Sequence, residues 1–119
     1  MVFLAGVNRV ILVGNLGRDP EIKNLESGVK LAKFTLATTE TFRDREGNRT
    51  EHTEWHNIVL WRGLADIAEK YLNKGKSIYL EGRIRTRKWE DQDGVTKYMT
   101  EILGDSMTML GGRNEDNQF

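Results

Sequence analysis

The sequence contains no cysteine, one proline and only two histidines among its 119 residues. The absence of cysteine excludes disulfides and thiolate metal sites, and it fits a protein of the reducing cytoplasm. With cysteine absent and histidine scarce, the chain offers no Ser/His/Asp or Cys/His set for nucleophilic catalysis. The sequence therefore favours a binding protein over an enzyme, and no cofactor is expected.

Long apolar runs are also missing. Residues 1–14 are apolar in patches, but Asn8 and Arg9 interrupt them and no basic segment precedes an unbroken apolar stretch, so we expect no secretory signal. No segment approaches the roughly 18 apolar residues that a membrane-spanning helix needs. We expect a cytoplasmic protein without a membrane partner, folded as one small domain.

The chain has no net charge, because 18 Lys and Arg residues balance 18 Asp and Glu residues. A neutral chain argues mildly against nucleic-acid binding, but binding depends on where the charges lie. Four basic residues fall between Arg43 and Arg62, and four more fall between Arg83 and Lys88. This clustering keeps a nucleic-acid partner open.

Extended segments dominate what the sequence does contain. β-Branched and apolar patterns predict strands over 8–14, 29–42 and 53–62. Helical spacing follows from Leu64 to Leu72, with Gly75 as the expected C-terminal cap. Strand patterns return over 77–89 and 96–103, with a broken continuation to Leu110, and Asp93-Gly94 marks a hairpin turn between them.

This order predicts an all-β fold, the five-stranded OB-fold Greek-key barrel with one helix between the third and fourth strands. OB-folds often bind oligonucleotides. The domain is expected to cover residues 1–112, and residues 113–119 read as a short polar C-terminal tail.

Strand alternation places the tryptophans away from the core. Trp55 and Trp61 share one side of the segment 53–62, whereas Ile58 and Leu60 share the other side and can fill the barrel. A single strand tryptophan is more often a core residue. Two on the side opposite a sufficient aliphatic set indicate a working surface, and Phe42 belongs with this group.

A basic ladder lies on one side of the segment 77–89. Arg83, Arg85, Arg87 and Trp89 share one parity, at a spacing of about 6.5–7 Å along the strand. An arginine run is often only a solvated face. Beside a tryptophan, however, arginine can hold phosphates while the aromatic ring stacks on any base. The pattern predicts a surface that binds single-stranded nucleic acid with little sequence preference.

Two other motifs carry weaker hypotheses. His52, Glu54 and His56 recur at every second residue, which makes a zinc or general-base site conceivable, but no other clustered ligand accompanies them. His56 reads better as a packed or interface histidine. Residues 14–17 are similar to a phosphate-binding loop but lack the third glycine and the following helix, so we expect a turn there.

Long gapless segments resemble the bacterial single-stranded DNA-binding proteins across Gly6 to Gly112. The matching segments are 6–21, 53–56, 81–89 and 109–113. The resemblance implies an OB-fold protomer in a homotetramer with single-stranded DNA wrapped around it, acting in replication, recombination and repair. In this family phenylalanine and tryptophan exchange at the positions of Phe42 and Trp61, and either ring preserves a stacking surface.

The resemblance also implies roles for individual residues. Base stacking is expected from Phe42, Trp55, Trp61 and Trp89. Phosphate contacts are expected from Lys74, Arg85, Arg87 and Lys88, and further from Arg43, Arg45 and Arg62. Subunit contacts are expected at Asn8, His56 and Tyr79.

The C-terminal tail departs from the family pattern. Relatives usually carry a long linker and an acidic tip that ends in phenylalanine and recruits replication and repair proteins. Glu115, Asp116 and Phe119 are similar to that tip without its run of aspartates. Partner recruitment through this tail is therefore expected to be weak.

Two rival functions remain open, and the first of them shares the expected fold. An interaction adaptor would bind mainly protein, with weak affinity for DNA. An RNA-binding or nucleic-acid-processing subunit would prefer RNA or turn over nucleic acid with a metal.

Overall fold

Six strands and one helix make up the computed structural model, which describes residues 5–111. The elements are β1 (Val10–Leu16), β2 (Glu21–Asn24), β3 (Lys30–Arg43), β4 (Arg49–Trp61), α1 (Gly63–Tyr71), β5 (Ser77–Glu90) and β6 (Thr96–Leu110). Within this part of the chain, no helix is both long and apolar enough to cross a membrane.

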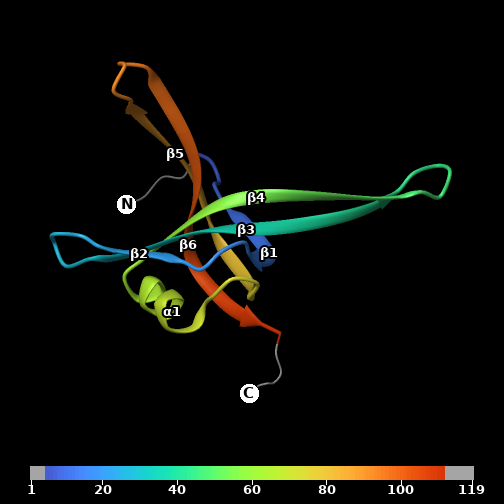
Figure 1. Cartoon of the computed structure of the whole chain (residues 1–119), viewed down its shortest axis with the longest axis horizontal. Helices are drawn as coiled ribbons and strands as arrows, with labels where there is room; N and C mark the ends of the chain where they lie inside the picture. Colours follow the sequence, from blue (N-terminus) through green and yellow to red (C-terminus); the bar gives the residue numbers. More distant parts are fainter. Residues whose placement is uncertain (1–4, 112–119) are drawn as a thin grey trace.

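The sheet closes on itself. Its order is β1-β5-β6-β4-β3-β2, and β1 also pairs with β3, so β1, β3, β4, β5 and β6 form a closed barrel. The β4–β6 pair is parallel, whereas the other pairs are antiparallel (Figure 1). The expected all-β OB-fold barrel is confirmed.

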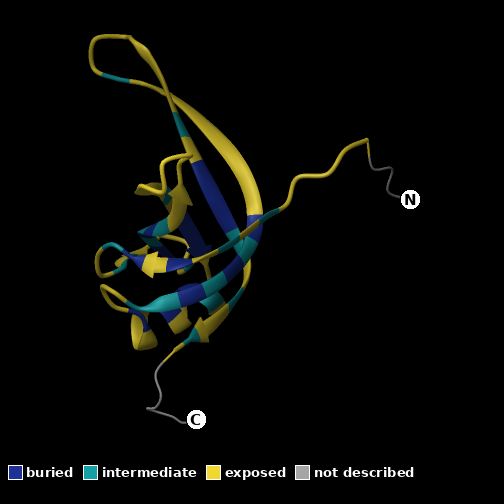
Figure 2. Cartoon of the chain, turned by 90° about the vertical axis from the view of Figure 1, so that its right-hand side faces the viewer, coloured by how far each residue is buried: buried dark blue, intermediate teal, exposed yellow. Residues whose placement is uncertain are grey.

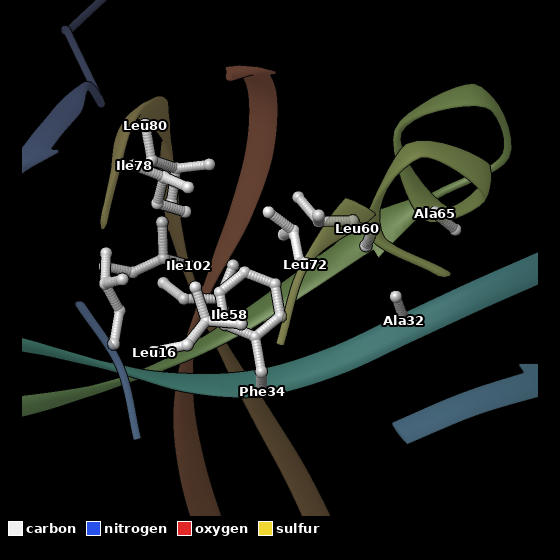
Figure 3. Packing of buried hydrophobic residues seen from close by; sticks show 12 residues of the cluster. Leu16, Ala32, Phe34, Ile58, Leu60, Ala65, Leu72, Ile78, Leu80 and Ile102 are labelled. Atoms are coloured by element: carbon white, nitrogen blue, oxygen red, sulfur yellow. The ribbon is translucent and has the colours of Figure 1, made fainter. Parts of the chain in front are cut away.

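Alternate residues of the strands fill the barrel. Phe34, Leu36, Ile58, Leu60, Ile78 and Leu80 have almost no exposed surface. Ala65 and Ala68 of α1 and Leu72 beyond it belong to the same cluster, and Figure 3 shows Leu72 beside Leu60. Truncation of a ring such as that of Phe34 in such a core typically costs about 3–5 kcal/mol.

β1 passes from one partner strand to another at a glycine. Gly14 pairs with Ile78 of β5, and the next residue, Asn15, also pairs with Ala37 of β3. A Cβ atom at Gly14 would lie 2.2 Å from the carbonyl oxygen of Ala37. The turn expected at 14–17 is therefore wrong for residues 14–16, which belong to β1. Gly14 serves instead to let the backbone of β3 approach β1 closely.

Two long hairpins extend beyond the barrel. The β3–β4 and β5–β6 hairpins project in different directions (Figure 1), and their outer parts are exposed while burial is concentrated where the strands cross (Figure 2). β4 begins at Arg49 rather than at residue 53, because it pairs with β3 without interruption to the Arg43–Arg49 pair.

Two further expectations need correction. The short strand β2 was not expected; it pairs with β3 from Glu21–Lys33 to Asn24–Lys30. The helix ends at Tyr71, so Gly75 is not its cap. Gly75 has φ of 89° and donates its N–H to the carbonyl oxygen of Leu16 at 2.8 Å, which ties the connection before β5 to β1.

Candidate nucleic-acid interface

The side chains of Trp55 and Trp61 lie on the outer side of β4. Their neighbours Ile58 and Leu60 point into the barrel, as strand alternation predicts. Trp55 is 57% exposed and Trp61 is 37% exposed, although both are large apolar side chains. The predicted division of β4 into an aromatic side and a core side is confirmed.

A glycine beside Trp55 makes room for its ring. A Cβ atom at Gly17, just after β1, would lie 2.4 Å from Cζ3 of Trp55 and 2.8 Å from Oγ1 of Thr35. The ring of Trp55 therefore lies against the backbone that follows β1. The ring occupies space that a side chain at residue 17 would fill.

Arg87 of β5 is held by three contacts on the same outer face. Its Nε donates to Oε1 of Glu101 at 3.1 Å, and its Nη2 lies 3.5 Å from Sδ of Met99. Its Cζ atom is 5.9 Å from the ring centroid of Trp89, within cation–π range. Arg87 therefore links β5 to β6, and the carboxylate of Glu101 balances its charge.

Arg85 lies on the same side of β5 but has different surroundings. It pairs through the backbone with Glu101 in the β5–β6 ladder, yet within residues 5–111 its guanidinium has no salt bridge or hydrogen bond. Its charge is therefore available to a ligand, whereas that of Arg87 is largely neutralised.

Glu101 is the residue that sequence reasoning missed. It is 3% exposed and is the one buried charged side chain in the described part of the chain. A lone glutamate in a strand normally indicates a solvated position. The burial of Glu101 follows from the β5–β6 register, which places it opposite Arg85. That register cannot be predicted from the sequence.

The other predicted stacking and phosphate residues are more scattered. The unbroken register of β3 with β4 puts Phe42 on the side of the hairpin that carries Thr38 and His56, opposite Trp55. Lys88 alternates to the side of β5 opposite Arg87. The remaining predicted residues are exposed: Arg43 ends β3, Arg45 lies in the hairpin turn, Arg62 precedes α1, and Lys74 follows α1.

The residues expected at subunit contacts have partners within the chain. The side-chain amide of Asn8 pairs with the backbone of Ile84 on β5. Its Nδ2 donates to the carbonyl oxygen of Ile84 at 2.8 Å, and its Oδ1 accepts from the N–H of Ile84 at 2.9 Å. Nε2 of His56 is 3.0 Å from Oγ1 of Thr38.

Tyr79 forms a polar network with Glu81. The hydroxyl of Tyr79 donates to Oε2 of Glu81 at 2.6 Å, and Arg9 pairs with the other carboxylate oxygen. The hydrogen bond to Glu81 raises the pKa of Tyr79, and the same bond, with Arg9, lowers the pKa of Glu81.

The two histidines do not share a ligand set. His52 contacts Glu54 at 3.2 Å, whereas His56 contacts Thr38. Across residues 5–111, no group of three or more His, Asp or Glu side chains is arranged to hold a metal ion.

Comparison with known proteins identifies the family. Residues 7–110 match the model of the single-strand binding protein family. Single-stranded DNA-binding proteins from two Neisseria meningitidis strains, of serogroups A and B, are each 50% identical over 111 residues. Those matches cover 93% of this chain and 64% of each relative, so the chain spans about two thirds of their length.

Solved structures agree with this match. The Plasmodium falciparum SSB in complex with ssDNA superposes with a TM-score of 0.82 at 37% identity, covering 92% of this chain and 100% of that one. A deletion mutant of the single-stranded DNA binding protein from Thermus aquaticus gives a TM-score of 0.78 at 29% identity, covering 91% of this chain and 52% of that one. With its sequence match, closed barrel and outward-facing tryptophans, this chain belongs to the single-strand binding protein family.

Proposed function

We propose that this protein binds and protects single-stranded DNA without sequence preference, as a non-catalytic protein of replication, recombination and repair. The observation that carries the proposal is the outer barrel face, where Trp55, Trp61 and Trp89 are exposed beside Arg85 and Arg87. The Plasmodium falciparum relative, a single-strand binding protein in complex with ssDNA, supports the same choice.

Two kinds of contact, base stacking and phosphate pairing, contribute to the proposed DNA binding on this face. Stacking on aromatic side chains contributes roughly 1–3 kcal/mol per base and accepts any base. Arg85 neutralises a phosphate and releases condensed counterions, which makes affinity depend on salt. Phe42, Lys74 and Lys88, with Arg43, Arg45 and Arg62, extend the proposed path over the arms and loops of the barrel.

The assembly we propose is a homotetramer. Ile11 and Val13 on the outer side of β1 are each 56% exposed, an unusual exposure for β-branched apolar side chains on a barrel strand. Tyr79 lies beside them, because it pairs with Val13 in the β1–β5 ladder. A second copy on this surface would bury these side chains, and Asn8 and His56 are proposed to lie at contacts between copies.

The C-terminal tail is proposed to recruit replication and repair proteins weakly. The residues that support this, Glu115, Asp116 and Phe119, lie outside the described residues, as does the rest of the tail predicted over 113–119. Deletion of 113–119 should leave DNA affinity unchanged and weaken capture of such partners in pull-down experiments. We also propose a nucleoid-associated, cytoplasmic location, because the proposed ligand is DNA.

The test is tryptophan fluorescence during titration with oligo-dT, with duplex DNA of equal length as the control, at two salt concentrations. We expect strong quenching by the single strand alone, weaker at the higher salt concentration. Unchanged emission with oligo-dT at low salt would overturn the proposal and favour a protein-binding adaptor. Tighter binding to oligo-U, or metal-dependent cleavage, would favour an RNA-binding or processing subunit.

A further inference from the structure

Glu101 presents a buried carboxylate at the outer face of β6. Its neighbour Ile102 points into the barrel, whereas Glu101 lies on the side that carries Arg85 and Arg87. Oε1 accepts from Nε of Arg87 at 3.1 Å, and no described residue donates a hydrogen bond to Oε2. A buried acceptor without a donor is costly, so a ligand that supplies one would be stabilised there.

Two hollows meet at this carboxylate. One, of about 250 Å³, has apolar walls from Leu31, Val59 and Trp61, and Arg85 also lines it. The other, of about 210 Å³, is lined by Asn57 and Met99. Lys33, Arg87 and Glu101 line both hollows. The carboxylate therefore lies between two spaces on the proposed DNA-binding face.

The chemistry of the larger hollow favours a base over a phosphate. Glu101 repels a phosphate beside it, and Arg87 is already paired with that carboxylate, so among the described residues Lys33 and Arg85 are the lining cations without an ion pair. The walls from Leu31, Val59 and Trp61 suit a flat, mostly apolar ring. Arg85, which lines the same hollow and has no ion pair among the described residues, can hold the adjoining phosphate while a base enters the hollow.

We propose that this hollow is a nucleobase pocket in which Glu101 accepts a hydrogen bond from the exocyclic amino group of a base. Of the two pyrimidines of DNA, cytosine fits this acceptor, because its N4 amine is a recognised donor to carboxylates. Thymine has no amino group, and its one ring donor, the N3–H, lies between two carbonyl oxygens that a carboxylate repels. The inference rests on the proposed binding of single-stranded DNA and adds a local base preference to it.

The test compares oligo-dC with oligo-dT of equal length at neutral pH and one salt concentration, for the wild type and for Glu101→Gln. The dC-to-dT affinity ratio of each protein is the readout, so that differences between the free oligonucleotides cancel when the two proteins are compared. We expect this ratio to fall by about tenfold in Glu101→Gln, because the amide loses the charge and offers a donor to thymine. Glu26→Gln, an exposed position in the β2–β3 turn, is the matched control and should leave the ratio unchanged.

A second variant, Glu101→Asp, keeps the charge that Arg87 requires but withdraws the oxygen from the hollow. We expect a smaller fall in the same ratio, and this variant decides the matter if Glu101→Gln does not fold. If the folded variants weaken dC and dT binding equally, Glu101 only positions Arg87 and the pocket is overturned, while DNA binding stands. If the wild type binds neither oligonucleotide, the proposed function itself fails.

Discussion

At the scale of single residues, Arg85 and Arg87 are neighbours on one strand face with different electrostatic surroundings. The guanidinium of Arg87 is engaged by Glu101, Met99 and Trp89, whereas that of Arg85 has no ionic or hydrogen-bonding partner within residues 5–111. A cation already neutralised by a buried carboxylate releases fewer counterions when DNA binds. The two arginines should therefore contribute differently to the salt dependence of binding.

We expect Arg85→Ala to reduce the slope of log affinity against log salt by about 0.7, the value for one phosphate of a single strand. Arg87→Ala should change the slope less but weaken quenching more, because the ring of Trp89 loses its cation. Titrations with oligo-dT at four salt concentrations measure both quantities. Equal losses of slope in the two variants would show that Glu101 does not neutralise Arg87 in the complex.

A second residue-scale prediction concerns Gly17. A methyl group there would meet the ring of Trp55, so Gly17→Ala should displace that ring and destabilise the fold by about 1–3 kcal/mol. We expect a shifted tryptophan emission maximum in the free protein and weaker oligo-dT binding. Gly63→Ala is the control, because a Cβ atom at Gly63 has no neighbour within 4 Å. An unchanged emission spectrum in Gly17→Ala would contradict the packing described for Trp55.

At the scale of elements, one lysine connects the helix to the barrel. Nζ of Lys30, at the start of β3, pairs with Glu69 and lies 3.1 Å from Oδ1 of Asp66, both on α1. Hydrogen bonds to Glu69 and then Asp66 raise the pKa of Lys30 above its ordinary value of about 10.5. The folded protein therefore holds this proton more tightly than the unfolded chain does.

The sign of this shift sets a pH window. The stabilisation from Lys30 is complete below the unfolded pKa, about 10.5, and is lost as pH rises through the higher folded value. We expect Lys30→Met to lower the melting temperature at pH 8, and the gap between variant and wild type to close as pH approaches 12. Lys23→Met, an exposed position on β2, should show no such pH-dependent gap. A gap that persists at pH 12 would mean that Lys30 acts through packing alone.

The elements also show which features were predictable. The side of β4 that bears Trp55 and the side that bears Ile58 follow from strand alternation, which needs no tertiary information. The pairing of Arg87 with Glu101 depends on the β5–β6 register, and the position of Phe42 depends on the unbroken β3–β4 register. Both registers are set by tertiary packing, so the sequence alone could not place these residues.

Local glycine signals were ambiguous for a related reason. Gly14 serves close strand approach within β1, and Gly75 adopts positive φ in the connection to β5 rather than at the end of α1. A glycine indicates that a side chain is excluded or that φ is positive. Which of these applies depends on which backbone lies opposite, and for Gly14 that backbone is Ala37, more than twenty positions away in the chain.

At the scale of the whole molecule, a net charge of zero is compatible with the proposed DNA binding, because some basic side chains of the described residues have no ionic partner. Some of the acidic side chains form internal ion pairs, as Glu69 with Lys30, Glu81 with Arg9 and Glu101 with Arg87. Arg43, Arg45 and Arg85 have no salt bridge within the described residues. Arg85 lies on the outer face of β5, and Arg43 and Arg45 lie at the tip of the β3–β4 hairpin, where each can contact a polyanion.

The proposed homotetramer is testable on the same scale. Over Val10 to Gly14, β1 pairs with β5 on one edge, and none of the described strands pairs with its other edge. An unpaired edge beside the exposed side chains of Ile11 and Val13 favours association with a second copy. Sedimentation equilibrium should therefore give four times the chain mass of 13.7 kDa.

A charged side chain on this surface should break the assembly without unfolding the barrel. We expect Ile11→Asp to reduce the measured mass while the far-ultraviolet circular dichroism stays unchanged, because the side chain of Ile11 lies outside the core. Val95→Asp, an equally apolar and exposed position in the β5–β6 turn, should remain tetrameric. A wild-type mass of one chain would overturn the tetramer, and a tetrameric Ile11→Asp would place the contact on another surface. A DNA strand wrapped around several copies gains affinity from each copy. The loss of affinity caused by Ile11→Asp should therefore be larger for long oligo-dT than for short oligo-dT.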